Sequence, residues 1–165
     1  MSDATARFSL PLIASGQAQK EMFHNEALTR IDALLEPVVE TVALDDPPAS
    51  PVPGQCWIVG ATPSGAWTGQ ARSIAAWTDG GWRFLAPVVG TTVWSRADAL
   101  FVHFDGSNWI IGEIIAAKIV IGGVQVVGSQ QPSVVAPTGG AVVDSEARNA
   151  IAAVIAVLKS HGLTA

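Results

Sequence analysis

The aromatic stretch 57–109 contains one phrase twice, first as Trp77-Thr78-Asp79-Gly80-Gly81-Trp82 and again as Phe104-Asp105-Gly106-Ser107-Asn108-Trp109. Each copy has an aromatic residue, an Asp-Gly turn and then a tryptophan. Asp-Gly between apolar runs is among the strongest short hairpin signals, because Gly tolerates the positive φ of tight hairpin turns. The stretch also holds all six tryptophans. It therefore predicts two or more β-hairpins that share a tryptophan-rich core.

Short apolar runs bounded by turn residues surround the two phrases. They predict strands at 56–59, 73–77, 82–85, 88–94, 100–104 and 109–111. Several short strands with regular turn signals favour a small antiparallel sandwich or barrel. A further strand is predicted at 38–44, where β-branched residues dominate. The proline-rich run 45–54 then predicts a stiff, extended connection to the β module.

An amphipathic helix is predicted before the β module, from about Gln17 to Glu36. Ser15 is its candidate N-cap, and Pro37 ends it because proline cannot continue a helix. Ahead of it, the run 8–13 predicts an extended arm or an edge strand, since Pro11 cannot donate to a ladder. Apolar residues recur at helical spacing and predict an oligomer interface; they are Phe23, Ala27, Ile31 and Leu34.

A second helix is predicted at the C-terminal end of the sequence. Asp144 is its expected N-cap and Gly162 its C′ residue. Its apolar stripe is also predicted to be an oligomer interface; it comprises Ile151, Val154, Ile155 and Leu158. A helix of this length is marginal by itself, so it must dock on its own domain or bundle with copies of itself.

The segment between the β module and the second helix is aliphatic and then flexible in composition. The run 114–127 lacks aromatics, has Gly122-Gly123 at its centre and favours strands. Such strands invite pairing with another chain, so we expect this segment to pack between subunits. The run 128–140 is rich in Gly, Ser, Gln and Pro and predicts a linker.

These elements predict an α+β fold: an N-terminal helix, a small Trp-rich antiparallel β module and a C-terminal helix. The predicted parts are 1–36 for anchoring and oligomerisation, 37–112 for the β module, 113–143 for the aliphatic strands and linker, and 144–165 for the C-terminal helix.

The composition excludes several classes of protein. The chain is 49% apolar and 14% charged, with a mean hydropathy of +0.38, yet no apolar run is long enough to span a bilayer. No signal peptide is expected, because no basic region precedes an apolar core near the N-terminus. Excess apolar surface without a membrane segment favours a homo-oligomer. The net charge of −5 argues against nucleic-acid binding, which needs a basic face.

No catalytic, metal or cofactor site is predicted. The 14 acidic residues do not single out a pair that converges, and the sequence has no P-loop, no G-x-S-x-G and no metal-binding cluster. Cys56 is the only cysteine, which excludes an internal disulfide and favours a buried apolar residue. His24 and Asn25 are expected to be structural, because buried polar groups are normally paired.

The tryptophans have two interpretations. Indole rings bury large areas and stiffen a small core. They can also stack on the C–H faces of sugar rings, with Asp and Asn nearby for the hydroxyls, although these are also preferred turn residues. The candidate glycan-binding residues are Trp67, Trp77, Asp79, Trp82, Asp105, Asn108 and Trp109.

Three stretches resemble a known bacterial family, DUF2793. They are 10–21 (LPLIASGQAQKE) with 24–28 (HNEAL), 65–70 (GAWTGQ), and 77–87 (WTDGGWRFLAP). The tail, from Gly139-Gly140 through 144–148 (DSEAR) to His161-Gly162-Leu163, resembles a C-terminal helix often found behind this domain. The family is found in alphaproteobacterial prophages and gene transfer agents. The resemblance implies a virion surface protein, either a head spike or a tail fibre protein, and carries over no catalytic residues.

The sequence therefore predicts a structural component of a phage-like particle, made in the bacterial cytoplasm and mounted on the virion surface. Expected partners are copies of itself, capsid or tail proteins, a fibre protein and host capsule polysaccharide. The ring would be a pentamer on a capsid vertex or a trimer in a tail fibre. The alternatives are a stand-alone carbohydrate-binding module, a capsule polysaccharide depolymerase and an adaptor that binds only protein.

Overall fold

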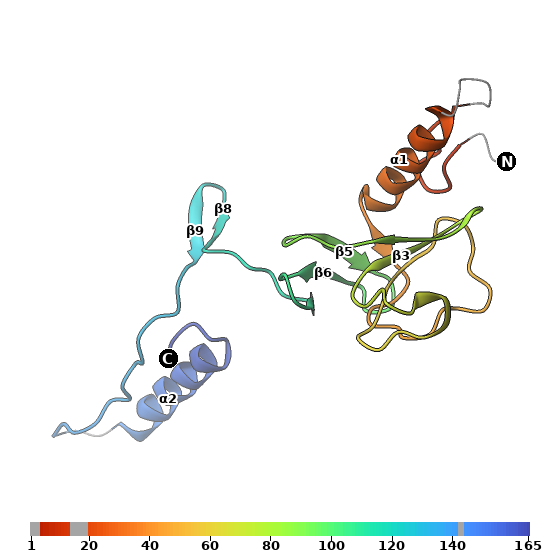
Figure 1. Ribbon diagram of the computed structural model, residues 1–165. Helices are drawn as coiled ribbons and strands as arrows, with labels where there is room; N and C mark the ends of the chain where they lie inside the picture. The colour runs from red at the N-terminus through yellow and green to blue at the C-terminus, as the bar shows by residue number, and fades with distance from the viewer. Residues whose placement is uncertain (1–3, 14–19, 142–143) are drawn as a thin grey trace. The chain divides into compact units, whose positions relative to one another are not determined.

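The computed structural model of the chain describes residues 4–13, 20–141 and 144–165 (Figure 1). It divides into two compact units, Met1–Glu113 and Ile114–Ala165. The first contains one helix and two sheets, and the second a hairpin and a helix. This is the predicted α+β fold, with a helix on each side of an antiparallel β module in sequence order. Among the described residues, no helix combines the length and hydropathy that a membrane span requires.

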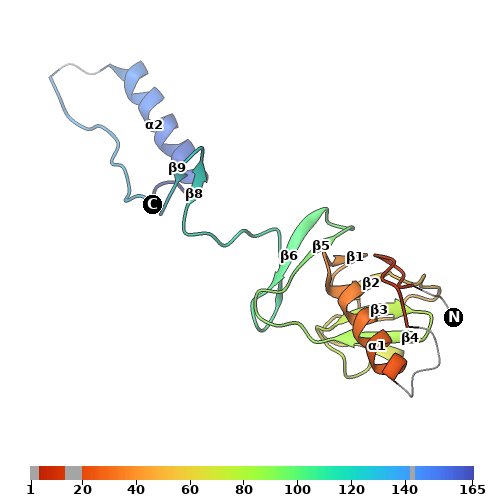
Figure 2. The same ribbon diagram turned by 90° about the horizontal axis from the view of Figure 1, so that it is seen from above.

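The first unit builds its two sheets from seven strands. Figure 2 shows the same ribbon from above. One sheet has the order β1-β5-β6-β7 and the other the order β2-β3-β4. Helix α1 spans Lys20–Leu34. The strands are β1 (Val38–Val39), β2 (Cys56–Ile58), β3 (Ile74–Thr78), β4 (Gly81–Leu85), β5 (Thr92–Ser95), β6 (Leu100–Phe104) and β7 (Trp109–Ile111), with a 3₁₀ turn at Gly65–Trp67.

Strict alternation along the three-stranded sheet gives it two buried faces. Cys56, Ile58, Ile74, Ala76 and Leu85 point to a core shared with Val93 and Val102 of the four-stranded sheet and with Ala33 of α1. The residues between them point to the opposite face and form a second, aromatic cluster. Successive side chains of a strand alternate between faces, so both cores follow from one pattern. The two sheets thus pack as a sandwich with α1 at one side.

Helix α1 ends two residues before the predicted boundary. It stops at Leu34, and Glu36 has a φ of +42°. Proline disfavours the helical conformation of the residue before it, so Glu36 does not continue the helix. The predicted N-cap Ser15 and start at Gln17 lie outside the described residues.

The strand predicted at 38–44 was too long. Only Val38–Val39 forms a strand, and it pairs with β5 in parallel rather than antiparallel orientation. A parallel partner needs a long crossover, which the intervening residues supply. After β1 the chain changes partner: the N–H groups of Glu40 and Leu44 donate to the carbonyls of Cys56 and Ile58 at 2.8 and 3.1 Å.

Two other strand predictions needed correction. The run predicted at 88–94 becomes a strand only at Thr92, because the Thr91 N–H donates to the Val88 carbonyl (2.9 Å) and closes a turn there. The arm at 8–13 forms no strand. It folds back so that the Thr5 N–H donates to the Leu10 carbonyl (3.0 Å), with one isolated bridge between Ala4 and Pro11.

The two Asp-Gly phrases do form hairpins, but with different turns. In the first, Trp77 lies opposite Trp82 and Thr78 opposite Gly81. The positive φ, +92°, falls on Gly81 and not on Gly80. In the second, four residues separate β6 from β7, and Gly106 has a φ of +108°. The phrase therefore predicted both hairpins correctly; the positive φ falls on the glycine of the Asp-Gly pair in the second copy, but on the next glycine in the first.

The second unit confirms the predicted aliphatic strands and the C-terminal helix. β8 (Ile119–Ile121) and β9 (Val124–Val127) form a hairpin around Gly122-Gly123. Helix α2 spans Ser145–Ser160, and the Asp144 carboxylate accepts the Ala147 N–H at 2.9 Å. At its other end Gly162 has a φ of +66°, and the Leu163 N–H donates to the Leu158 carbonyl (3.0 Å). Both caps are as predicted.

Candidate functional site

Four of the six tryptophans form one cluster on the outer face of the three-stranded sheet. Trp82 lies at its centre, with ring centroids 5.5 Å from Trp57, 5.1 Å from Trp67 and 4.8 Å from Trp77. These separations are typical of edge-to-face pairs, which add to the burial energy. Phe84 stacks beside Trp82 at 6.5 Å. The aromatic rings thus contribute to the stability of this face of the sheet.

The remaining two tryptophans lie elsewhere. Trp94 pairs with Phe101 on the four-stranded sheet (5.0 Å), and Trp109 packs on Phe104 (5.3 Å) beside the main core. The prediction of one shared tryptophan core was therefore wrong, because the two hairpins belong to different sheets. The Trp109 indole N–H donates to the Arg72 carbonyl at 2.8 Å and ties the sheets together.

The predicted glycan-binding residues separate into two groups. Trp67, Trp77, Asp79 and Trp82 belong to the first hairpin and its cluster, whereas Asp105, Asn108 and Trp109 belong to the second. Trp67 is fully buried and offers no ring face to a sugar, while the rings of Trp77 and Trp82 are half-buried.

Asp105 has a structural role in the second turn. Its Oδ1 accepts the N–H groups of Ser107 and Asn108, both at 2.7 Å. These hydrogen bonds stabilise the carboxylate and lower the pKa of Asp105. One oxygen of this side chain is therefore engaged by the turn itself.

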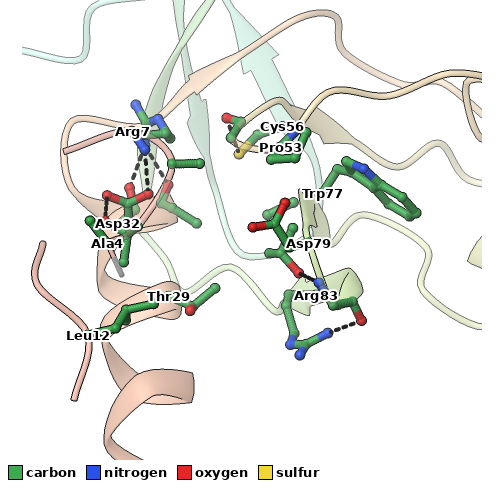
Figure 3. A pocket seen from close by; sticks show the side chains of 17 residues that line it. Ala4, Arg7, Leu12, Thr29, Asp32, Pro53, Cys56, Trp77, Asp79 and Arg83 are labelled. Carbon is green, nitrogen blue, oxygen red and sulfur yellow. Dashed lines mark hydrogen bonds between the residues drawn. The ribbon is translucent and has the colours of Figure 1, made fainter. Parts of the chain in front are cut away.

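The first Asp-Gly turn borders a cavity of about 200 Å³, drawn in Figure 3. The N-terminal loop and α1 form one wall, and the β3–β4 hairpin and the start of β2 form the other. Asp79 and Trp77 are the only predicted glycan-binding residues on its surface. Figure 3 shows the Asp79 carboxylate among the lining residues, whereas the Trp77 indole points away from them. The lining also includes Thr5, Arg7, Leu12, Thr29, Asp32, Ala33, Pro53, Cys56, Ala76 and Arg83.

Asp32 holds the N-terminal loop against α1 at one side of this cavity. Its buried carboxylate accepts three hydrogen bonds, from the Thr5 hydroxyl (2.7 Å), the Arg7 N–H (2.9 Å) and the Phe8 N–H (2.8 Å). Buried carboxylates need such compensation, because desolvating an unpaired charge is costly. Asp32 therefore fixes the loop in place without a direct ion pair to a guanidinium.

Arg7 caps the C-terminal end of α1. Its Nη1 donates to the carbonyls of Asp32 (2.7 Å), Ala33 (3.1 Å) and Leu35 (3.2 Å), and its Nη2 donates to the Glu36 carbonyl (2.8 Å). The last carbonyls of a helix have no partners within it and carry partial negative charge, which a cation stabilises. Both Nη atoms of Arg7 are used in this cap.

Arg83 joins the opposite wall to the helix. Its Nε donates to the Glu26 carboxylate at 2.8 Å, and its Nη1 donates to the carbonyls of Gly80 and Trp82, both at 3.2 Å. Arg30 binds the other oxygen of Glu26 at 3.1 Å. Partial burial alone would raise the pKa of Glu26, but the hydrogen bonds from Arg83 and Arg30 outweigh it and lower the pKa.

Cys56 lies on the cavity floor as a buried thiol, as predicted. Burial raises its pKa to about 11, because the thiolate is poorly solvated there. Asn25 is also structural, as predicted: its side chain accepts the Ile13 N–H (2.9 Å) and donates to the Ile13 carbonyl (3.0 Å). His24 is exposed. In the described part of the chain, no three His, Cys, Asp or Glu side chains gather around a metal site.

The predicted interface residues are mostly exposed in the single chain. On α1, Phe23 is 76% exposed, and Ala27, Ile31 and Leu34 are also exposed. On α2, Val154 is 59% exposed, Ile151 is exposed, and Ile155 and Leu158 are half-buried. Helix α2 has no buried residue. These faces agree in position with the predicted stripes, and their role in assembly stays a prediction.

The sequence did not single out four polar residues that line the cavity. Arg7, Thr29 and Asp32 are single polar residues without a motif, and Arg83 is one residue in the middle of a strand. The only available signal was the alternation of β4, which places Arg83 on the face opposite Trp82 and Phe84. That α1 covers this face follows from tertiary packing alone.

The fold and the cavity define the structural class of the protein. It is a two-sheet β module whose N-terminal helix lies against one of its hairpin turns. A family model described as "Protein of unknown function (DUF2793)" matches residues 24–110, which is more than half of the chain. The chain belongs to this family. No curated protein matches it.

Proposed function

We propose that the protein is a structural component of a phage-like particle, mounted on the virion surface as a head spike or tail fibre protein. The observation that carries this proposal is the amount of apolar surface that the single chain leaves exposed. Ile114 is 89% exposed and Phe23 is 76% exposed, and every described residue of the β8–β9 hairpin is exposed. Exposed apolar patches of this kind mark surfaces that bind other proteins.

Family membership supports the particle context. The resemblance described above implies proteins of prophages and gene transfer agents, so copies of the chain would be covered by one another and by capsid or tail proteins. A closed ring is the usual solution for identical subunits. It would be a pentamer on a capsid vertex and a trimer in a tail fibre.

Attachment to host-surface polysaccharide is the second part of the proposal. The first hairpin supports it, because Asp79 stands at the mouth of a cavity large enough for a small polar ligand. A ring presents several such sites together, and multivalency turns weak single contacts into firm adsorption.

Two measurements test the proposal. Light scattering of the purified full chain should give the mass of a homo-oligomer, and antibody-labelled electron microscopy should place the protein on intact particles. A strict monomer that binds capsule glycan would support a stand-alone carbohydrate-binding module instead. Reducing ends released from capsule would support a depolymerase, and an oligomer with no glycan bound on an array would support a protein-only adaptor.

A further inference from the structure

The cavity at the first Asp-Gly turn offers a ligand mainly a hydrogen-bond acceptor, the Asp79 carboxylate. Most of its hydrogen-bond donors are already used: Arg7 by the helix carbonyls and the Thr5 hydroxyl by Asp32. Arg83 is held by Glu26 and two carbonyls. Asp79, by contrast, has no hydrogen bond or ion pair to any described residue, although its carboxylate can accept several bonds. The Asp79 carboxylate can therefore accept hydrogen bonds from the donors of a ligand.

The charges around the cavity balance. The lining contains two positively charged residues, Arg7 and Arg83, and two negatively charged residues, Asp32 and Asp79, so their formal charges cancel. A site without net charge favours neither a cation nor an anion over a neutral ligand. Hydroxyl groups are the neutral donors that a carboxylate such as Asp79 binds well.

The volume of the cavity and its apolar lining further restrict which ligands can bind. The volume of about 200 Å³ is below the roughly 300–1,000 Å³ of pockets that hold drug-sized molecules. Much of the lining is aliphatic and small, including Leu12, Ala33, Pro53 and Ala76. Such walls suit the C–H face of one ring, and the Thr29 hydroxyl, which donates to the Asn25 carbonyl (2.8 Å), can still accept a bond.

From these observations we propose that the cavity between Asp79, Thr29 and the N-terminal loop binds one terminal pyranose unit of a glycan. This inference rests on the glycan contact in the proposed function and names the site and the unit recognised. The Asp79 carboxylate accepts two neighbouring hydroxyls, and the ring lies on the aliphatic wall. Because the cavity holds a single ring, it recognises chain ends and not the middle of a polysaccharide.

The same reasoning separates the two copies of the repeated phrase. Asp105 is the counterpart of Asp79, but it does not line this cavity, and one of its oxygens holds its own turn. The first turn lines the cavity together with residues of α1, whereas the second turn does not line it. Asp105→Asn is therefore a matched control for Asp79→Asn.

The test uses the full chain and a panel of methyl pyranosides, which mimic a terminal unit, with binding followed by saturation-transfer NMR. The best glycoside should bind with a Kd on the order of 1 mM, as a ligand of this size allows. Asp79→Asn should raise that Kd at least tenfold, and Asp105→Asn should leave it within twofold. Ala6→Leu, which adds bulk at a lining position and removes no side-chain hydrogen bond, should also raise it at least tenfold.

Cyclodextrins, which have no terminal unit, should not bind. Equal effects of Asp79→Asn and Asp105→Asn would overturn the assignment, as would cyclodextrin binding or a panel with no binder. Unfolding curves of each variant show whether it still folds. If Asp79→Asn chains assemble on particles but bind no sugar, both proposals stand. Sugar binding by a chain that never enters particles would contradict the proposed function alone.

Discussion

Single side chains, and not motifs, hold the candidate site together. Asp32 binds three groups of the N-terminal loop, and Arg7 caps four carbonyls at the end of α1. Each contact joins residues at least 24 positions apart in sequence. These residues were not singled out from the sequence, because an isolated Asp or Arg carries no local sign of a distant partner.

Replacing Asp32 with Asn should destabilise the fold markedly. The amide keeps one acceptor oxygen, but its NH₂ group would face a loop N–H that then has no acceptor. An unsatisfied buried donor costs about 1–3 kcal/mol. We expect the free energy of unfolding, measured with urea, to fall by about 2 kcal/mol. Asp79→Asn at the exposed turn should change it by less than about 0.5 kcal/mol. Equal effects of the two variants would contradict the role of Asp32.

Cys56 should make the stability depend on alkaline pH. Burial raises the pKa of its thiol from an ordinary 9.0 to about 11. The unfolded thiol therefore loses its proton first, so the stabilisation is complete below pH 9 and is lost as pH rises through 11. Two pKa units correspond to about 2–3 kcal/mol.

The test compares the wild-type chain with Cys56→Ala in urea unfolding at pH 8 and pH 11.5. The wild-type protein should lose about 2–3 kcal/mol more than the variant between the two conditions. Because other groups titrate in both chains, the difference between them isolates Cys56. Parallel losses would show that the thiol is solvated in the folded state.

Among the elements, the β3–β4 hairpin shows both the strength and the limit of local sequence signals. Asp79-Gly80 predicts the turn, because these residues suit tight turns in any context. The positive φ, however, falls on Gly81, at +92°. A turn with the sequence Asp79-Gly80-Gly81 can close in more than one way, and the pairing of Trp77 with Trp82 decides between them.

Gly81→Ala should therefore cost more than Gly80→Ala. A side chain at positive φ is strained by about 1–2 kcal/mol, and no neighbouring atom needs to be displaced for this cost to arise. At Gly80 the nearest atom to an added Cβ is the flexible Nη2 end of Arg83 at 3.2 Å, and Thr78 Oγ1 follows at an ordinary 3.7 Å, so we expect a loss below about 0.5 kcal/mol. Thermal unfolding of both variants measures the difference; a larger loss at Gly80 would mean that the turn closes the other way.

At the scale of the whole molecule, the unusual property is the amount of apolar surface that the single chain leaves exposed. Helix α2 has a good N-cap and a good C-cap but no buried residue. Its sequence therefore fixes where the helix begins and ends, but in the single chain much of its apolar face stays exposed. Helices of this length gain most of their stability from packing. The proposed assembly into a ring of identical chains would provide that packing.

Val154→Glu should lower the mass of the assembled protein. The side chain lies in the apolar stripe of α2 and is 59% exposed in the single chain. Burying a carboxylate there would cost more than the contact provides. Ala152→Glu is the matched control. Ala152 is two positions before Val154, which places it nearly on the opposite side of the helix. Light scattering should show smaller species for Val154→Glu only; equal masses would remove α2 from the interface.

Local patterns in the chain were enough to establish the two helices, most of the strands, both caps of α2, the strand character of the aliphatic run around Gly122-Gly123 and the buried state of Cys56. Each depends on neighbours a few positions away: an alternation, a cap or a turn. Tertiary packing alone decided that β1 pairs in parallel with β5, that the tryptophans divide between two sheets, and that α1 roofs the first Asp-Gly turn and not the second. Those outcomes depend on contacts between distant residues, whose geometry no local pattern encodes.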